Sequence, residues 1–257
     1  MKGDRLTIVL NGKTVIDNTR LPDVPESGSI ALQHHGGINK KTGELSPASS
    51  LIQFRNIWIK KLGGDEEGFV SLFNGKDLTG WTGDTKGYAA EDGKIVLDPN
   101  RGGGNLYTVD EYGDFILLFE FKLTPGANNG LAIRSPLSGN PAYDGMEIQI
   151  LDNSAPKYET LKPYQFHGSI YGVVPAKRDY LKPVGQWNSQ KVIAQGHRIK
   201  VILNDTTIVD ADIDQASTPK TMDEKDHPGL KRDKGHIGFC GHGDYLEFRN
   251  IRIKTLD

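Results

Sequence analysis

The sequence has one cysteine among its 257 residues, little net charge and no long apolar run. The lone thiol, Cys240, rules out an internal disulfide and is compatible with an oxidising or a reducing compartment. No segment reaches the roughly 20 consecutive apolar residues that a helix needs to cross a bilayer. A net charge of −2, without basic runs interleaved with aromatics, disfavours nucleic-acid binding. We therefore expect neither a membrane span nor a nucleic-acid partner.

What the chain does contain is an internal repeat. Three segments recur in the same order: 5–17 aligns with 198–210, 28–36 with 235–243, and 51–62 with 245–256. Residues 1–62 therefore resemble the C-terminal fragment of one unit, whereas 68–257 resembles a complete unit. The glycine-rich, acidic residues 63–67 between them predict a linker.

The fragment at 1–62 is expected to supply only a few strands. So small a sheet buries too little apolar surface to offset its chain entropy. We expect it to be inactive, and to pack on the main unit, on a partner chain or on an absent front half.

The local pattern indicates β-structure almost throughout. Residues 115–123 alternate with the period of two that is typical of a strand with one strongly buried face. Further strands are expected at 94–98, 130–134, 146–151, 199–204, 207–210, 236–240 and 246–254. The 31 glycines and 13 prolines suit the tight turns between antiparallel strands. We therefore predict an all-β fold, an antiparallel sandwich or jelly roll with one sheet face free for a ligand.

The last expected strand predicts a β-bulge. Leu246 and Phe248 share one parity, whereas Ile251 and Ile253 have the other, so a regular strand would send the two pairs to opposite faces. A bulge near Arg249–Asn250 would return all four side chains to one buried face.

Several motifs together carry a family resemblance. They are FVSLFNGKDLTGW (69–81), NNGLAIRS (128–135), GMEIQILD (145–152), HGSIYG (167–172), GQWN (185–188) and the closing GHIGFCGHG and LEFRNIRIK. In this order they resemble the 3-keto-disaccharide hydrolase family, which is abundant in Bacteroidetes. The resemblance implies a concanavalin A-like jelly roll and action on sugars or glycosides, often oxidised at C3.

The resemblance also implies export, to the periplasm, the cell surface or the medium. The first residues lack the apolar region of a signal peptide. Because the repeat indicates that upstream sequence is missing, this absence does not argue for the cytoplasm.

A polar cluster is expected on the strand that contains Glu147. Glu147 and Gln149 point away from the isoleucines of this strand, and Arg134 points outward from the strand before it. If the strands are neighbours, these three side chains form a site suited to sugar hydroxyls. The alternative is a solvated face with a surface ion pair worth about 0–1 kcal/mol. The resemblance favours a site.

Four other residues are candidates. A histidine ordinarily titrates near neutrality, so His167 is a candidate base or metal ligand, although it could be a hydrogen-bonded loop residue. Tyr171 belongs to the same HGSIYG motif, and Asp144 precedes the strand of Glu147. His242 is a candidate sugar contact, but His35 matches it in the partial copy, which favours a structural role for that turn.

The substrate that the resemblance implies suggests a mechanism. A ketone at C3 acidifies the C2 proton, so one base could abstract it and expel the C1 substituent. We expect Glu147 or His167 to be that base, with Arg134, Gln149 or a bound cation stabilising the enolate. The sequence contains no recognised metal motif, but a divalent metal could still be held by residues distant in the sequence. The alternative function is a non-catalytic, lectin-like carbohydrate-binding module, which needs no base.

Overall fold

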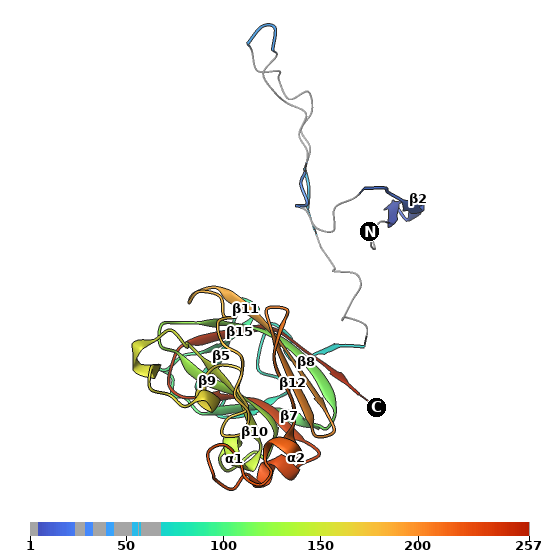
Figure 1. Cartoon of the computed structure of the whole chain (residues 1–257). Helices are drawn as coiled ribbons and strands as arrows, with labels where there is room; N and C mark the ends of the chain where they lie inside the picture. Colours follow the sequence, from blue (N-terminus) through green and yellow to red (C-terminus); the bar gives the residue numbers. More distant parts are fainter. Residues whose placement is uncertain are drawn as a thin grey trace. The chain divides into compact units, whose positions relative to one another are not determined.

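The computed structural model describes residues 5–23, 29–32, 40–43, 53–55, 57 and 68–256. The chain divides into two compact units, Met1–Glu67 and Gly68–Asp257 (Figure 1). No helix among the described residues is long and apolar enough to span a membrane.

The first unit contains an antiparallel hairpin of β1 (Arg5–Leu10) and β2 (Lys13–Arg20). Its turn, Asn11–Gly12, has φ values of 49° and 78°, the left-handed conformation that a two-residue hairpin turn requires. The first repeated segment of this unit, residues 5–17, therefore lies within a hairpin. Most of the two other repeat segments of this unit lies outside the described residues.

The second unit consists of two packed antiparallel sheets. The larger sheet has eight strands, with β3 (Val70–Ser71) beside β15 and the others in the order β13 (Thr206–Asp212), β12 (Arg198–Leu203), β11 (Trp187–Gln195), β8 (Phe115–Leu123), β15 (Leu246–Thr255), β6 (Lys94–Leu97) and β5 (Tyr88–Glu91). The smaller sheet has the order β10 (Met146–Leu151), β9 (Asn128–Ser135), β14 (Gly235–Gly241), β7 (Asn105–Tyr112) and β4 (Trp81–Gly83). This arrangement confirms the predicted all-β jelly-roll sandwich.

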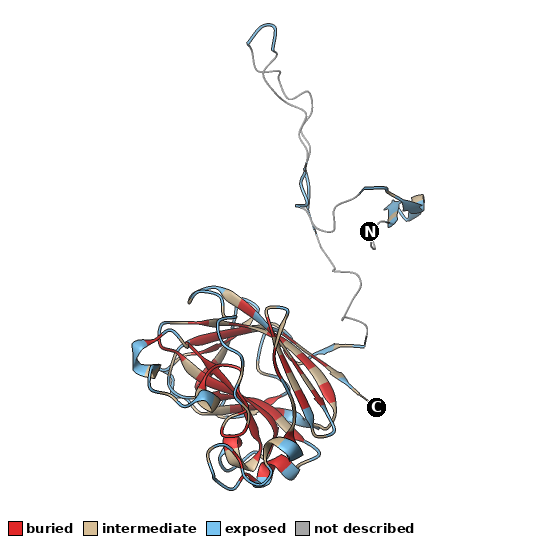
Figure 2. Cartoon of the chain, in the orientation of Figure 1, coloured by how far each residue is buried: buried red, intermediate tan, exposed pale blue. Residues whose placement is uncertain are grey.

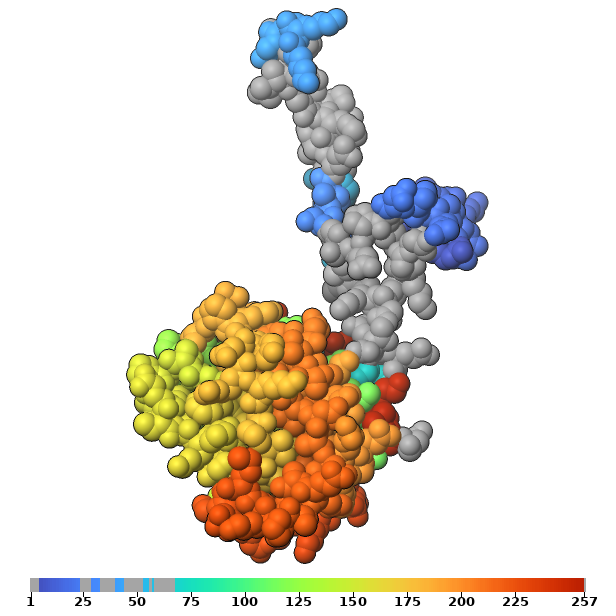
Figure 3. Space-filling view, viewed as in Figure 1, coloured from blue at the N-terminus to red at the C-terminus, as the bar shows by residue number. Residues whose placement is uncertain are grey.

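The helices of this unit are all short. They are α1 (Pro141–Asp144), α2 (Ile213–Ala216) and the 3-10 turns η1 (Pro156–Tyr158), η2 (Pro163–Gln165) and η3 (Pro228–Lys231). In the space-filling view, the yellow segment that follows β10 adjoins the deep orange segment that follows β13 (Figure 3). Loops distant in the sequence therefore share one surface.

The core lies between the two sheets (Figure 2). Every second residue of β8, from Phe115 to Leu123, is at most 2% exposed, as the alternation predicted. Leu131 and Ile148 of the smaller sheet are fully buried in the same cluster. Because burying each such side chain is worth about 1.5–3 kcal/mol, this interface dominates the stability of the unit.

The predicted bulge in β15 is confirmed. The register of β15 against β8 shifts between Arg249 and Arg252, and Asn250 has a φ of 53°. As a result, residues on both sides of the shift, such as Phe248 and Ile251, are at most 1% exposed.

Candidate functional site

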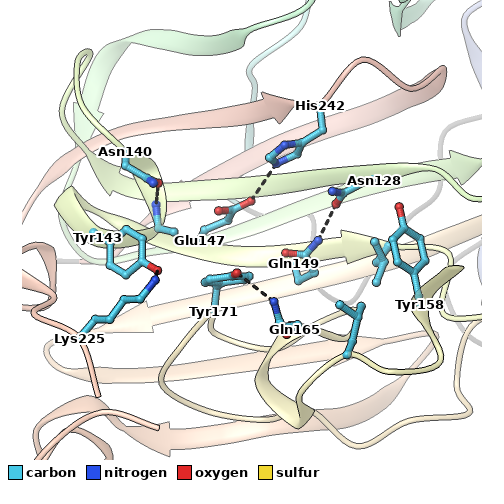
Figure 4. Close-up of a pocket in the computed structure, with 13 residues that line it drawn as sticks. Asn128, Asn140, Tyr143, Glu147, Gln149, Tyr158, Gln165, Tyr171, Lys225 and His242 are labelled. Atoms are coloured by element: carbon cyan, nitrogen blue, oxygen red, sulfur yellow. Dashed lines mark hydrogen bonds and ion pairs between the residues drawn. The ribbon is translucent and has the colours of Figure 1, made fainter. Parts of the chain in front are cut away.

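A pocket of about 390 Å³ opens over β10, the first strand of the smaller sheet (Figure 4). Its size is within the range of small-molecule binding sites. The residues that line it come from β9, β10, α1, η1, η2 and the loops between elements: Asn128, Asn140, Ala142, Tyr143, Glu147, Gln149, Leu151, Tyr158, Leu161, Gln165, Tyr171, Lys225 and His242. The pocket is therefore predominantly polar, with three tyrosines in its wall.

Glu147 lies within this pocket, and its side chain is only 8% exposed. Its backbone pairs with Ala132 of β9, as the expected pairing of the two strands requires. A Cβ on the neighbouring Gly130 would lie 1.9 Å from Glu147 Oε1, so only glycine leaves room for the carboxylate there. Within the described residues, buried Oε1 accepts no hydrogen bond. A buried oxygen without a hydrogen bond is costly, so Oε1 is available to a ligand or a proton.

His242 is the titratable neighbour of this carboxylate. Its Nε2 lies 3.7 Å from Glu147 Oε1, and its side chain is 46% exposed (Figure 4). The interaction with Glu147 raises the pKa of His242 above its ordinary value, because a nearby negative charge favours the protonated ring. The structure thus places His242 in the pocket, although the repeat favoured a purely structural role for its turn.

Amide groups line the base of the pocket. Gln149 Nε2 donates to Asn128 Oδ1 at 2.7 Å, and Gln165 Nε2 donates to the Tyr171 hydroxyl at 3.0 Å. Tyr171 is held beside β10 because its backbone N–H donates to the Glu147 carbonyl at 2.9 Å. Such fixed donors and acceptors can recognise the hydroxyl groups of a sugar.

A lysine and a tyrosine form a second polar group in the wall. Lys225 Nζ donates to the Tyr143 hydroxyl at 3.0 Å, and both residues line the pocket (Figure 4). The Tyr143 hydroxyl also raises the pKa of Lys225, which keeps the ammonium charged. The pocket therefore has a cationic group whose hydrogen-bond partner is a phenol hydroxyl instead of a carboxylate.

The prediction that Arg134 projects beside Glu147 is wrong. Arg134 is 1% exposed, and its guanidinium donates to Asp114 Oδ1 at 2.8 Å and to the Gly113 and Gly196 carbonyls. A φ of 48° at Arg134 interrupts the alternation on which the prediction relied. Its side chain therefore binds the ends of other strands and does not line the pocket.

The structure does not bring His167 into this pocket, where the sequence placed a candidate base. His167 packs on Phe121 with ring centroids 5.1 Å apart, and burial lowers its pKa to about 3. Its Nδ1 accepts from the Leu151 N–H at 3.4 Å, so the ring is a neutral interior group. It is not among the residues that line the pocket.

The structure does not place Asp144 in the pocket of Glu147 either. Asp144 Oδ2 accepts from the Asn140 N–H at 2.7 Å, so the carboxylate closes the turn at α1. The residue faces a separate hollow that is lined by Gly139 and Arg232. Its sequence neighbour Tyr143 faces the pocket in its place.

A divalent metal was the one cofactor considered for this site. In the part of the chain that the structure describes, no group of three His, Cys, Asp or Glu residues is placed to hold an ion.

The family is decided by comparison with known proteins. The family model described as the 3-keto-alpha-glucoside-1,2-lyase-like domain matches residues 1–60 and 68–254. The chain belongs to this family. This lyase-like family is the one that the sequence motifs resembled, so that prediction is confirmed.

Individual relatives agree with the assignment to the lyase-like family. The 3-keto-disaccharide hydrolase of Bacteroides thetaiotaomicron is 27% identical, over 75% of this chain and 80% of the relative. A crystal structure of a candidate glycosyl hydrolase from Parabacteroides distasonis is 32% identical, with a TM-score of 0.65, over 73% of this chain and 99% of that one. A second crystal structure of a candidate glycosyl hydrolase from the same organism is 27% identical, with a TM-score of 0.63, over 74% of this chain and 95% of that one. These relatives support a carbohydrate-active role and an enzyme of the hydrolase class.

Sequence reasoning missed several pocket residues of this lyase-like domain. Tyr143 belongs to a helix of four residues and Lys225 to a loop, and neither segment has a recognisable pattern. Asn128 is the first residue of a strand, where a polar side chain is typical of a turn. The only available signal for Tyr143 was its position shortly before Glu147 in the sequence. Loop residues are placed by contacts distant in the sequence, which periodicity does not report.

Proposed function

We propose that the unit at 68–257 cleaves glycosides whose sugar carries a ketone at C3, with Glu147 as the base that removes the C2 proton. One observation carries the proposal: the nearly buried Glu147 carboxylate has an oxygen without a hydrogen bond, and it faces a pocket of sugar-binding dimensions. The names of the family and of the Bacteroides relative support this substrate class.

The proposed reaction is an elimination. Glu147 takes the C2 proton, and the C–H electron pair forms a C2–C3 double bond while the ketone oxygen becomes an enolate. Collapse of the enolate forms the C1–C2 double bond and breaks the bond from C1 to the leaving oxygen, which takes up a proton. Addition of water across C1–C2 then makes the overall reaction a hydrolysis, and no oxidant or reductant is needed.

The number of carboxylates favours this reaction over ordinary glycoside hydrolysis. Conventional glycosidases use two carboxyl groups that flank the scissile bond. Among the described residues that line the pocket, Glu147 is the only carboxylate. One base is sufficient when a neighbouring ketone acidifies the proton that is removed.

Replacing Glu147 by glutamine tests the proposal. Glu147→Gln keeps the shape of the side chain but removes the base, so kcat on a 3-keto-disaccharide should fall by about 100-fold or more. Gly130→Ala should also lower kcat strongly, because its methyl group would occupy the position of Glu147 Oε1. Glu159→Gln, on an exposed turn, is the matched control and should retain full activity. Released sugar is measured together with thermal unfolding.

Two results would overturn the proposal. One is full turnover by Glu147→Gln. The other is a wild-type protein that binds the keto sugar without cleaving it, which would favour the lectin-like alternative.

A further inference from the structure

We propose that Tyr143 and Lys225 bind the C3 ketone oxygen and stabilise the enolate, and that the buried pair of Asp223 and His227 positions them. This inference deepens the proposed function and rests on it. It gives the loop lysine and the phenol the electrostatic role that was first expected of Arg134.

The direction of one hydrogen bond is the first argument. An ammonium group has donors only, so in the 3.0 Å contact Lys225 Nζ must donate and the Tyr143 oxygen must accept. The hydroxyl hydrogen of Tyr143 then remains available for an oxygen in the pocket. A hydroxyl that accepts from a cation is polarised and becomes a better donor. The pair is therefore suited to an oxygen that gains negative charge during the reaction.

Tyr143 is fixed from behind by a buried histidine. Its ring lies 4.7 Å from the His227 ring between centroids, at 45°. His227 Nδ1 lies 3.1 Å from the Ala142 carbonyl oxygen, and Nε2 lies 3.0 Å from Asp223 Oδ1. The side chains of His227 and Asp223 are only 1% and 4% exposed. Because both ring nitrogens of His227 have a polar partner and the ring is buried, it packs against the phenol in one fixed position.

Asp223 also fixes the loop that carries Lys225. Its Oδ1 accepts from the Lys225 N–H at 3.1 Å, and its own N–H donates to the Gly172 carbonyl at 3.0 Å. Thr221 Oγ1 donates to the Lys225 carbonyl at 2.9 Å. The loop is thereby attached to the segment beside Tyr171, so three parts of the pocket wall share one support.

The charges in the pocket are distributed as the reaction requires. His242 is beside the Glu147 carboxylate, whereas the Lys225 ammonium contacts the Tyr143 hydroxyl. The imidazole is therefore near the base, and the ammonium belongs to a separate group that can face the ketone oxygen (Figure 4). Donors held in position before the reaction stabilise developing negative charge at no cost of reorganisation.

Two substitutions test the pair in the full chain. Tyr143→Phe and Lys225→Met should each lower kcat on a 3-keto-disaccharide by about 100-fold, the usual effect of losing one oxyanion donor, with KM changed less than threefold. Lys225→Arg should recover part of the loss because it keeps a cationic donor. The exposed Lys231→Met, outside the pocket, is the matched control and should behave as wild type.

Exchange of the C2 hydrogen in heavy water, followed by NMR, isolates the enolate step. Both variants should slow this exchange as much as kcat while thermal unfolding stays unchanged. His227→Gln should lower kcat by a smaller factor than Tyr143→Phe does. In the double variant, kcat should be no lower than in Tyr143→Phe alone, because His227 acts through Tyr143.

Two outcomes would overturn the inference, and they can be distinguished. If wild type exchanges and cleaves the keto sugar, but both variants keep kcat and exchange within twofold, the pair has no catalytic role. If wild type itself shows neither exchange nor cleavage, the proposed function fails and the inference fails with it.

Discussion

At the scale of the residue, side chains on one strand could be placed from alternation alone. Glu147 and Gln149 both line the pocket, as the strand pattern indicated. Arg134 does not, because a single left-handed residue interrupts the alternation at the end of β9. His167 could not be placed from its residue type, because this histidine of a polar motif is buried against Phe121. A residue type states what chemistry is available, but only burial decides whether the group meets a ligand.

His167 leads to a prediction about acid stability. Its folded pKa is about 3 against 6.5 for an ordinary histidine, so between these values the unfolded chain binds a proton that the folded chain does not. Its contribution to stability is therefore complete above pH 6.5 and is lost as the pH falls toward 3, by up to about 1.4 kcal/mol per pH unit. Denaturant unfolding of wild type and His167→Asn at pH 7, 6, 5 and 4 measures this.

The comparison with His167→Asn removes the titration of all other groups. The asparagine can still accept from the Leu151 N–H but cannot be protonated in this range. The difference between the two unfolding free energies should change steadily in favour of the variant as the pH falls. A difference that is independent of pH would contradict the interpretation of a buried neutral imidazole.

At the scale of the element, β15 shows that an irregularity can be predicted when a repeat and a hydrophobic pattern agree. The change of parity between Phe248 and Ile251 required an extra residue, and the structure has the bulge at that place. The short helix α1 shows what could not be predicted. Four residues have no useful periodicity, yet this turn places Tyr143 in the pocket and Asp144 outside it.

Asn250 leads to a prediction about the bulge. It is exposed and has a φ of 53°, a conformation that asparagine and glycine tolerate and that a β-branched residue does not. Asn250→Val should lower the free energy of unfolding by about 1–2 kcal/mol, whereas Asn250→Gly should be close to neutral. Equal melting temperatures for the two variants would show that the bulge does not depend on this conformation.

At the scale of the whole molecule, all residues that line the pocket belong to the second unit. The family model also matches residues 1–60, which agrees with the repeat that predicted a partial first copy. That the first unit is inactive, and that the protein acts outside the cytoplasm, stay predictions. The first unit does expose apolar side chains on its hairpin, such as Val9 and Leu10 at 58% and 62%.

Removing residues 1–67 tests the independence of the second unit. The 68–257 chain should keep kcat and KM on the keto sugar within twofold, because no described pocket residue is removed. Its melting temperature should equal that of the corresponding transition in the full chain. A large loss of turnover by a folded 68–257 chain would show that the first unit contributes to the site.

The sequence alone determined the class of fold, the face of β10 that carries Glu147 and Gln149, the bulge in β15 and the family. These features follow from a period of two and from ordered motifs, which are local properties of the chain. Only the tertiary structure decided that His242 lies beside Glu147, that Lys225 reaches Tyr143, and that Arg134 and His167 are buried. The physical reason is that alternation gives the direction of a side chain within its own strand, whereas the position of a loop depends on backbone angles and on contacts with residues far away in the sequence.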